Sequence, residues 1–253
     1  MPASPPDTHV DALLDWYVQV ARDLPWRRTT DPYAILVSEV MLQQTQVARV
    51  IERYEAWLER WPTVEALAAA PLGDVLTAWV GLGYNRRARA LWEAARAVAR
   101  DGWPDDLTRL PGVGPYTAAA VGSFAFGRDE LAIDTNARRV YGRWGFTPER
   151  GSAALNQAVM ELGATVCRAH VAHCDACPIV ACASRGMEVV RRPRAKRVRF
   201  EDTDRYARGR VLAAVAGREP WPDYLGAERI ARALDGLAAD GLIKREGDHT
   251  SLP

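Results

Sequence analysis

All four cysteines of this 253-residue chain fall within one short segment, with the spacing C-x6-C-x2-C-x4-C. They are Cys167, Cys174, Cys177 and Cys182. Four thiolates this close in sequence form a ligand set for an iron–sulfur cluster or for a tetrahedral zinc ion. Disulfides are the alternative. Residues 1–11 lack the basic start and apolar run of an export signal, so we expect a cytosolic chain whose cysteines bind metal.

Composition adds few constraints. Apolar residues make up 48% of the chain, enough for a buried core, and the chain lacks an apolar run long enough for a membrane span. The net charge of +1 says nothing about nucleic acid. Lysine occurs only at Lys196 and Lys244, so the positive charge is almost all arginine, whose planar fork pairs well with phosphate.

Apolar residues recur at helical spacing along the chain before the cysteines, and no alternating β pattern is present there. The first helix is predicted around residues 10–18, and Asp31-Pro32 opens a second. Further helices are predicted over 47–60, 63–70, 73–80, 86–100 and 116–126, separated by proline and glycine breaks. The predicted fold class is therefore all-α, built from short helices.

The chain after the cysteines reads as a linker and a small module. Residues 186–200 are strongly basic, which is typical of a solvated linker or of a segment that lies along phosphates. Residues 204–216 and 227–240 predict two helices, and 241–248 predict a strand and a tight turn. This order predicts a winged-helix-like module over 201–253.

Leu110-Pro111-Gly112-Val113-Gly114 separates two predicted helices. Its glycines permit a tight turn that aims backbone N–H groups, at the start of the next helix, at one anion. A helix-hairpin-helix motif holds a DNA phosphate in this way, whereas an ordinary helix–helix turn is the alternative. Asp134 follows about twenty residues later, with Arg138 and Arg139 behind it, and that order is typical of base-excision glycosylases.

The chain resembles the helix-hairpin-helix DNA glycosylases with an iron–sulfur cluster, most closely the MutY adenine glycosylases. The resemblance covers about residues 20–185. It rests on Leu24-Pro25-Trp26-Arg27, Asp31-Pro32-Tyr33, the string S-E-V-M-L-Q-Q-T-Q-V from Ser38 to Val47, Gly81-Leu82-Gly83-Tyr84, Leu110 to Val121, Asp134-Thr135-Asn136, Leu155-Asn156-Gln157-Ala158 and Leu162-Gly163-Ala164. Two features depart from the family. The last two cysteines are separated by four residues instead of the usual five, and residues 201–253 do not resemble the large C-terminal domain that reads 8-oxoguanine in longer members.

The resemblance implies two helical subdomains with a DNA-binding cleft between them and a [4Fe-4S] cluster on the four cysteines. The catalytic domain would span 1–185, with a six-helix subdomain over 28–140 and an iron–sulfur subdomain formed by 1–27 and 141–185. The implied partner is double-stranded DNA with a mispaired adenine. We expect a monomer that acts in the cytoplasm at the nucleoid, with no membrane association.

The resemblance also assigns catalytic roles. Asp134 would face the sugar and stabilise its oxocarbenium-like charge, and Glu39, in an apolar helical run, would protonate adenine and then activate water. Tyr116 stands where bifunctional relatives carry a Schiff-base lysine, so base removal without strand cleavage is expected. Asn136 completes the catalytic set. Asp134 could also be a helix N-cap, which is compatible with its catalytic role.

The target nucleotide of duplex DNA must be flipped out before its glycosidic bond can be reached. The resemblance assigns wedging and pocket contacts to Gln44 and Leu42. It assigns the lining of the adenine pocket, or the orientation of its carboxylates, to Arg22, Trp26, Arg27 and Gln157. Trp26 could equally be a core residue.

Three alternatives stay open from sequence. A mismatch thymine or uracil glycosylase also carries a tyrosine at the Tyr116 position, although the S-E-V-M-L-Q-Q-T string with Asn156-Gln157 favours adenine. A non-enzymatic iron–sulfur DNA-binding regulator would need neither Glu39 nor Asp134. A structural zinc protein is the third. Adenine opposite 8-oxoguanine or guanine is the leading expectation.

Overall fold

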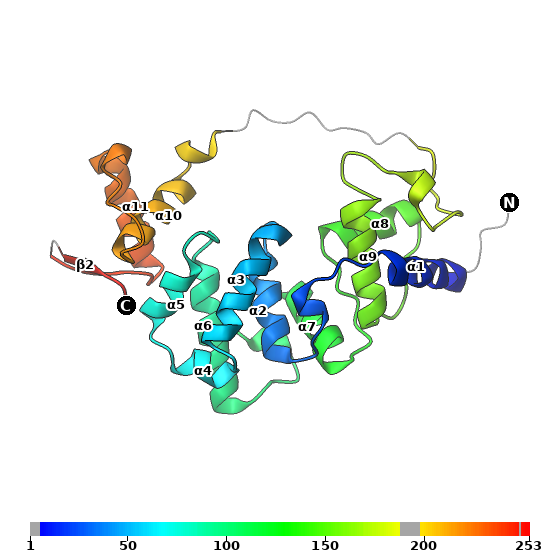
Figure 1. Cartoon of the computed structure of the whole chain (residues 1–253), viewed down its shortest axis with the longest axis horizontal. Helices are drawn as coiled ribbons and strands as arrows, with labels where there is room; N and C mark the ends of the chain where they lie inside the picture. Colours follow the sequence, from blue (N-terminus) through cyan, green and yellow to red (C-terminus); the bar gives the residue numbers. More distant parts are fainter. Residues whose placement is uncertain (1–5, 188–197, 248) are drawn as a thin grey trace. The chain divides into compact units, whose positions relative to one another are not determined.

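A computed structural model describes residues 6–187, 198–247 and 249–253 (Figure 1). These residues are mostly helical, and their only β structure is one two-stranded sheet and an isolated bridge between Cys167 and Ala172. The all-α prediction is therefore confirmed. Most of the predicted basic linker, residues 188–197, lies outside the described residues.

The chain divides into two compact units, one formed by residues 1–36 and 113–193 and the other by residues 37–112 and 194–253. The sequence-based grouping was 28–140 against 1–27 and 141–185. By contacts, 28–36 and 113–140 group with the cysteine segment, where α7 (Pro115–Phe126) and α8 (Thr135–Trp144) both pack on α9 (Ala153–Thr165), and the division into two subdomains at 28–140 stays a prediction.

The first unit contains α1 (Pro6–Val20), the short 3-10 helix η1 (Pro25–Arg27), α7, α8, α9 and η3 (Cys174–Ala176). Its core joins one face each of α1, α8 and α9, which lie together in Figure 1. Buried members are Leu13, Val140, Trp144, Leu162 and Ile179. Ile179, from the cysteine segment, ties that loop to the helices through apolar burial, which is the main stabilising term in folding.

Helix α2 (Pro32–Leu42) begins in the first unit and continues into the second. Asp31 precedes it, and its Oδ1 accepts a hydrogen bond from the Tyr33 N–H at 3.0 Å, while Pro32 occupies the first turn, where no N–H is needed. Every residue from Tyr33 to Met41 is buried. A helix that is apolar on all sides is buried on all sides, and this places Glu39 in the protein interior.

The second unit continues with α3 (Val47–Arg60), α4 (Val64–Ala69), α5 (Leu72–Trp79), α6 (Arg86–Asp101) and η2 (Leu107–Arg109). The helix bounds match the sequence prediction to within one or two residues. Trp57 packs edge-on against both Trp61 and Trp79, with ring centroids 4.7 and 5.5 Å apart. Thr63 caps α4 by accepting a hydrogen bond from the Ala66 N–H.

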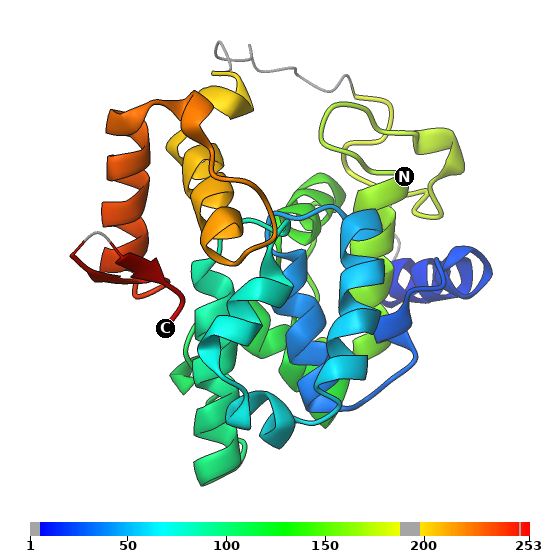
Figure 2. The ribbon, with the colours of Figure 1, turned by 60° about the vertical axis from the view of Figure 1, so that its left-hand side comes forward.

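The C-terminal part of the second unit contains η4 (Phe200–Asp202), α10 (Asp204–Val215), η5 (Asp223–Leu225), α11 (Ala227–Ala239) and a hairpin of β1 (Lys244–Glu246) and β2 (His249–Ser251). The strands pair antiparallel, with Lys244 opposite Ser251. Helices α10 and α11 lie side by side (Figure 2). The two predicted helices and the predicted strand are present, while the winged-helix-like assignment stays a prediction.

Polar contacts tie this C-terminal part to α6, and apolar packing ties it to α5. Arg89 of α6 donates a hydrogen bond to the Asp240 carbonyl at 2.6 Å, and the Asp240 carboxylate pairs with Arg86 at 3.6 Å and with Arg208. The Leu252 side chain packs so closely on α5 that a Cβ at Gly73 would lie 3.1 Å from it. Residues 198–253 are therefore integrated with the 37–112 helices.

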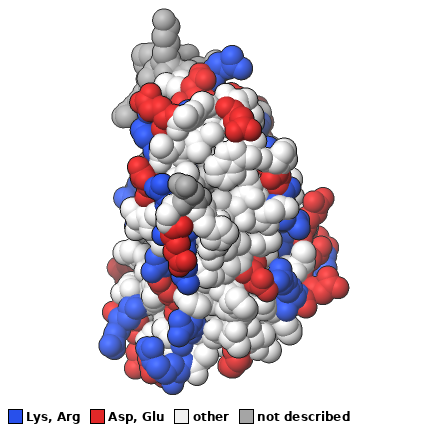
Figure 3. All heavy atoms as spheres, turned by 90° about the vertical axis from the view of Figure 1, so that its left-hand side faces the viewer, with Lys and Arg blue, Asp and Glu red and all other residues white. Residues whose placement is uncertain are grey.

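On the face drawn in Figure 3, acidic and basic side chains are interspersed, in keeping with the net charge of +1. None of the helices in the described ranges is both long and apolar enough to cross a bilayer.

Candidate active site and cysteine cavity

Asp134 is the N-cap of α8, as the sequence suggested. Its Oδ1 accepts a hydrogen bond from the Ala137 N–H at 2.6 Å, and its Oδ2 accepts one from Asn136 Nδ2 at 2.8 Å. A cap of this kind satisfies one of the unpaired N–H groups in the first helical turn. Asp134 is half-buried, and the two donors fix the orientation of its carboxylate beside the positive end of the helix dipole.

The loop before Asp134 is held by Asn156, a buried residue of α9. Its Nδ2 donates to Ser123 Oγ at 3.0 Å and to the Glu130 carbonyl at 2.8 Å, and its Oδ1 accepts from the Ala132 N–H at 3.0 Å. Asn156 thus supports the backbone that delivers Asp134. The backbone at Gly151 packs against the same loop. A Cβ at Gly151 would lie 2.0 Å from the Glu130 carbonyl oxygen, so only glycine fits there.

Asn136 belongs to a second polar chain, which runs toward the cysteines. Its Oδ1 accepts from Arg139 Nη2 at 2.8 Å, and Arg139 also donates to the carbonyls of Gly163 and Cys167 at 2.8 and 2.9 Å. Burial lowers the pKa of Arg139. One arginine therefore links the Asp134–Asn136 pair to the first cysteine through charge-assisted hydrogen bonds.

Glu39 lies in the middle of α2 and is 5% exposed. Its place in an apolar helical run is therefore matched by burial in the structure. A buried carboxyl at this position is shielded from bulk water, and a positioned carboxyl of this kind is a candidate for proton transfer.

Tyr116 is the second residue of α7 and is half-buried, with its hydroxyl 3.9 Å from Met160 Sδ of α9.

The glycine hairpin has the local geometry that the sequence suggested. Gly112 adopts φ +74°, and a Cβ there would meet Ala90 Cβ of α6 at 2.6 Å, so glycine is required for two reasons. Val113 is buried and anchors the turn. Gly114 is the exposed N-cap of α7, makes no side-chain cap hydrogen bond, and is followed by Pro115 at the first helical position, so an exposed glycine turn leads directly into a helix N-terminus.

A buried acid that the sequence analysis did not single out organises the predicted pocket residues. Glu161 of α9 is 0% exposed, and it accepts hydrogen bonds from Arg22 at 2.6 and 3.1 Å and from Arg27 at 2.8 Å. Tyr17 donates to Gln157 Oε1 at 2.8 Å one turn earlier on α9, and the Arg27 guanidinium lies over the Tyr17 ring. The position of Glu161 among apolar residues of α9 was the sequence signal that could have identified it as a buried acid.

The structure therefore brings Arg22, Arg27 and Gln157 into one cluster around α9. Trp26 lies on η1 between the two arginine contacts and is 9% exposed, as expected for a core residue. Arg22 and Arg27 both form ion pairs with Glu161. They therefore compensate a buried carboxylate and attach the 22–27 segment to α9.

The wedge candidates lie at the C-terminal end of α2. Leu42 is half-buried, whereas Gln44 is exposed and has φ +55°. Tyr84, which precedes α6, has φ +49° and is 37% exposed. The left-handed region is unfavourable for residues with a Cβ, and such strain gathers at ligand-contacting positions. These two are the only non-glycine residues with positive φ in the described part of the chain.

One arginine holds both strained turns, and the sequence analysis also missed it. Arg87 is the second residue of α6, and burial lowers its pKa to about 10. Its guanidinium donates to the carbonyls of Val40, Met41 and Gln43 at 2.8, 3.1 and 2.6 Å, to Thr45 Oγ1 at 3.2 Å, and to the carbonyls of Leu82 and Gly83 at 3.2 and 2.9 Å. Arg87 thereby joins the backbone around Gln44 to the turn before Tyr84.

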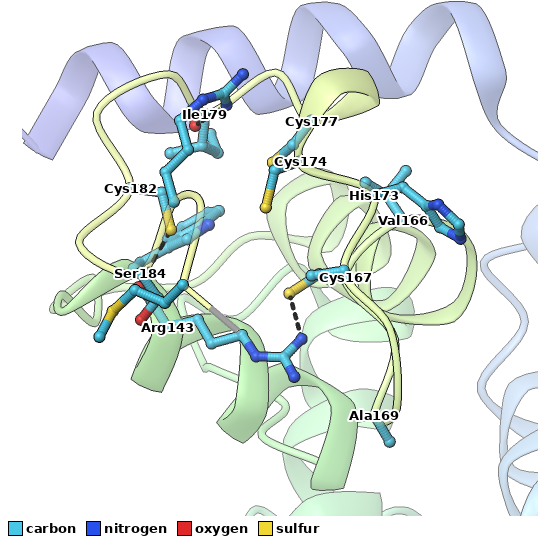
Figure 4. Close-up of a pocket in the computed structure, with 14 residues that line it drawn as sticks. Arg143, Val166, Cys167, Ala169, His173, Cys174, Cys177, Ile179, Cys182 and Ser184 are labelled. Atoms are coloured by element: carbon cyan, nitrogen blue, oxygen red, sulfur yellow. Dashed lines mark hydrogen bonds between the residues drawn. The ribbon is translucent and has the colours of Figure 1, made fainter. Parts of the chain in front are cut away.

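All four cysteines line one cavity of about 280 Å³, and Figure 4 shows them around it. Trp144, Val166 and Ile179 form apolar walls. Arg143 Nη1 donates to Cys167 Sγ at 3.2 Å, and the Cys182 thiol donates to the Arg143 carbonyl at 3.2 Å. Burial, with a contribution from the neighbouring cysteines, raises the pKa of Cys177 and Cys182, so a bound cation would favour the thiolate form of these two side chains.

The four cysteines line this cavity without converging on one point. Across the described residues, no group of three or more histidine, cysteine or acidic side chains is arranged to hold one metal ion. Four cysteines around a larger cavity fit a polynuclear centre with its own inorganic sulfur.

Comparison with known proteins gives consistent matches. Residues 37–165 match the family described as HhH-GPD superfamily base excision DNA repair protein. An adenine DNA glycosylase of Mycobacterium tuberculosis is 41% identical over 275 aligned residues, which cover 93% of this chain and 90% of that protein. The human adenine DNA glycosylase is 42% identical over 204 residues, covering 66% of this chain and 37% of that protein.

Solved structures agree on the fold. A thermostable thymine-DNA glycosylase matches with a TM-score of 0.62 and 28% identity, covering 67% of this chain and 91% of that one. A trapped covalent complex of endonuclease III with DNA matches with a TM-score of 0.59 and 24% identity, covering 68% of this chain and 90% of that one. At that identity the second match carries the fold alone.

Proposed function

Because the chain belongs to the HhH-GPD superfamily of base excision DNA repair proteins, and within it to the adenine DNA glycosylases, we propose that it removes adenine from DNA by hydrolysing the N-glycosidic bond. The observation that carries the proposal is the contrast between two carboxyls. Glu39 is buried in an apolar helix, whereas Asp134 is held at a helix N-terminus by two hydrogen-bond donors.

The contrast divides the chemistry between them. Adenine leaves readily only when a ring nitrogen is protonated, and a desolvated carboxyl such as Glu39 suits that donor role. The sugar left behind develops positive charge, which a preorganised carboxylate stabilises without rearrangement. Asp134 has that preorganisation, because the Ala137 N–H and the Asn136 amide already orient its oxygens.

Tyr116 supports base removal without strand cleavage. A phenol cannot form the Schiff base through which lysine-dependent glycosylases cut the sugar–phosphate backbone. The product would then be an abasic site in an intact strand.

We propose that the substrate is double-stranded DNA in which adenine is mispaired with 8-oxoguanine or guanine, and that the protein acts as a monomer in the cytoplasm, at the nucleoid. The exposed Gly112 and Gly114 turn, with the N-terminus of α7 behind it, supports a phosphate contact. The exposed, strained Gln44 supports a role in filling the gap that a flipped nucleotide leaves.

We propose that Cys167, Cys174, Cys177 and Cys182 hold a [4Fe-4S] cluster, which would order the segment beyond α9. The four-cysteine lining of one cavity supports this, as does the Arg143 guanidinium, which would offset the negative charge of the thiolates. Elemental analysis of purified protein should give about four irons per chain and no stoichiometric zinc. Zinc at one ion per chain would contradict the cluster.

The decisive experiment for the proposed function compares Glu39→Gln with Glu52→Gln, the same substitution at an exposed glutamate of α3. Adenine release is measured under single-turnover conditions from duplexes with adenine opposite guanine or 8-oxoguanine, and thymine and uracil opposite guanine serve as the alternative substrates. Glu39→Gln should lower the rate by about 10² to 10⁴ and leave duplex binding intact, since a positioned acid contributes that much. A loss under about tenfold would remove Glu39 from the role of acid.

A further inference from the structure

Tyr84 is covered by an arginine from the C-terminal part of its unit. Arg205 of α10 places its guanidinium over the Tyr84 ring, 4.7 Å from the centroid, and donates a hydrogen bond to the Tyr84 hydroxyl. The same guanidinium lies 5.0 Å from the centroid of the Phe200 ring. Arg205 is thus held against two aromatic rings, one of which belongs to a strained, exposed residue.

A cavity of about 270 Å³ opens beside this contact. Gln44, Tyr84, Phe200 and Arg205 line it, together with the 80–83 turn, Arg49, part of α10, and Glu219, whose carboxylate is paired with Arg210. The volume is slightly below the range of about 300 to 1,000 Å³ that is usual for drug-sized ligands, so the cavity suits one planar ring system. Both residues with left-handed φ, Gln44 and Tyr84, therefore face the same small cavity.

The lining has the chemistry that reads a nucleobase. Arginine and glutamine side chains form paired hydrogen bonds with base edges, and guanine in particular offers two acceptors that match the arginine fork. Tyrosine, phenylalanine and arginine provide flat surfaces on which a base can stack. A purine with carbonyl acceptors fits this combination better than a pyrimidine, because it offers both the larger face and the acceptor pair.

The charge of Arg205 is also free to serve a ligand. Other arginines of the C-terminal part donate to carboxylates or carbonyls within the protein: Arg208, Arg210, Arg229, Arg232 and Arg245. Arg205, in contrast, has no carboxylate partner among the described residues, and its contacts are the two rings and the Tyr84 hydroxyl. A guanidinium placed by stacking retains donors for a further acceptor.

We propose that Arg205 is a specificity-determining residue that, with Gln44 and Tyr84, contacts the purine opposite the target adenine. This inference rests on the proposed function and extends it to a residue outside the region 37–165 that matches the superfamily. The C-terminal part thereby contributes to reading the mispair, although it does not resemble the domain that has this task in longer enzymes.

The test measures single-turnover adenine release, at two salt concentrations, for adenine opposite 8-oxoguanine, guanine and cytosine. The variants are Arg205→Met, which keeps length and loses charge, and Arg205→Lys, which keeps charge and loses the planar fork. Arg232→Met is the control, because Arg232 lies on α11 and pairs with Glu228, away from the cavity lining. Thermal unfolding of each variant checks the fold.

Arg205→Met should reduce the preference for the two purine partners over cytosine by about 5- to 150-fold, the range that a good arginine–base pair provides. Arg205→Lys should fall between Arg205→Met and the parent, and Arg232→Met should match the parent. An unchanged preference in a folded variant would overturn the inference. An equal loss on all partners with a shallower salt dependence would also overturn it, because that pattern identifies a phosphate contact. A parent that releases no adenine from any duplex would instead refute the proposed function.

Discussion

Removal of the Arg87 guanidinium by Arg87→Met should destabilise the protein and disorganise the Gln44 and Tyr84 turns together. One side chain donates to five carbonyls and one hydroxyl, and these acceptors flank both residues with left-handed φ. A non-glycine residue in such a region costs about 1–3 kcal/mol, so the two turns together cost about 2–6 kcal/mol. The hydrogen bonds from Arg87 to the backbone of both turns offset this strain.

The expected loss can be estimated from the same contacts. A hydrogen bond to a charged group contributes about 1.5–3 kcal/mol, but six bonds from two NH2 groups share donors and do not add. Desolvation, which lowers the pKa of Arg87, further reduces the net gain. We therefore expect a loss of about 3 kcal/mol in the free energy of unfolding. For a chain of this size that corresponds to a fall of about 6–12 °C in Tm.

Urea unfolding and thermal melting measure the loss, and limited proteolysis between residues 42 and 86 reports on the two turns. Arg100→Met is the matched control, because Arg100 is an exposed α6 residue whose ion pair, within the described ranges, is with its neighbour Asp101, and no measurable shift is expected there. Arg87→Lys should behave like Arg87→Met, since an ammonium cannot span both turns. Stability within about 1 kcal/mol of the parent for Arg87→Met, or full rescue by lysine, would refute the reasoning.

Three further outcomes are expected. Glu161→Gln should lower the free energy of unfolding in urea by about 2–4 kcal/mol, because it leaves two guanidiniums beside a neutral amide, although the partial exposure of Arg22 reduces the loss. An unchanged free energy of unfolding would show that these ion pairs do not stabilise the fold. Tyr116→Lys should give a borohydride-trappable Schiff base with an abasic site, and no adduct above parent level would mean that the side chain faces away from the sugar. Asp134→Asn should retain salt-sensitive DNA binding and lose adenine release; binding lost with activity would leave only the cap role.

Local features were predictable where neighbours in sequence decide the outcome. The start of the helix at 32 followed from Asp31-Pro32, and burial of Glu39 followed from the apolar residues on both sides of it in that helix. The Asp134 cap followed from an acidic residue directly before a helix. The turn at Gly112 followed from the pair of glycines, and the structure confirms its left-handed φ.

Residues whose partners are distant in sequence could not be identified in this way. Arg22 and Glu161 are 139 residues apart, and Arg205 and Tyr84 are 121 apart. An arginine in an arginine-rich chain carries no mark of whether it will meet a carboxylate, a carbonyl or an aromatic ring. Arg87 in particular resembles its exposed neighbour Arg86, and only the return of the chain past α2 gives it six acceptors.

The amino-acid sequence alone specified the helices, the cap at Asp134, the glycine turn and the clustering of the four cysteines. These features depend on residue propensity and spacing over one or two turns. Tertiary packing decided three further properties. It determined which buried charges are compensated, which backbone turns are held under strain, and which arginine keeps hydrogen-bond donors for a ligand. These properties depend on the desolvation and pairing of groups that the folded chain brings together, and neither quantity exists before the chain has folded.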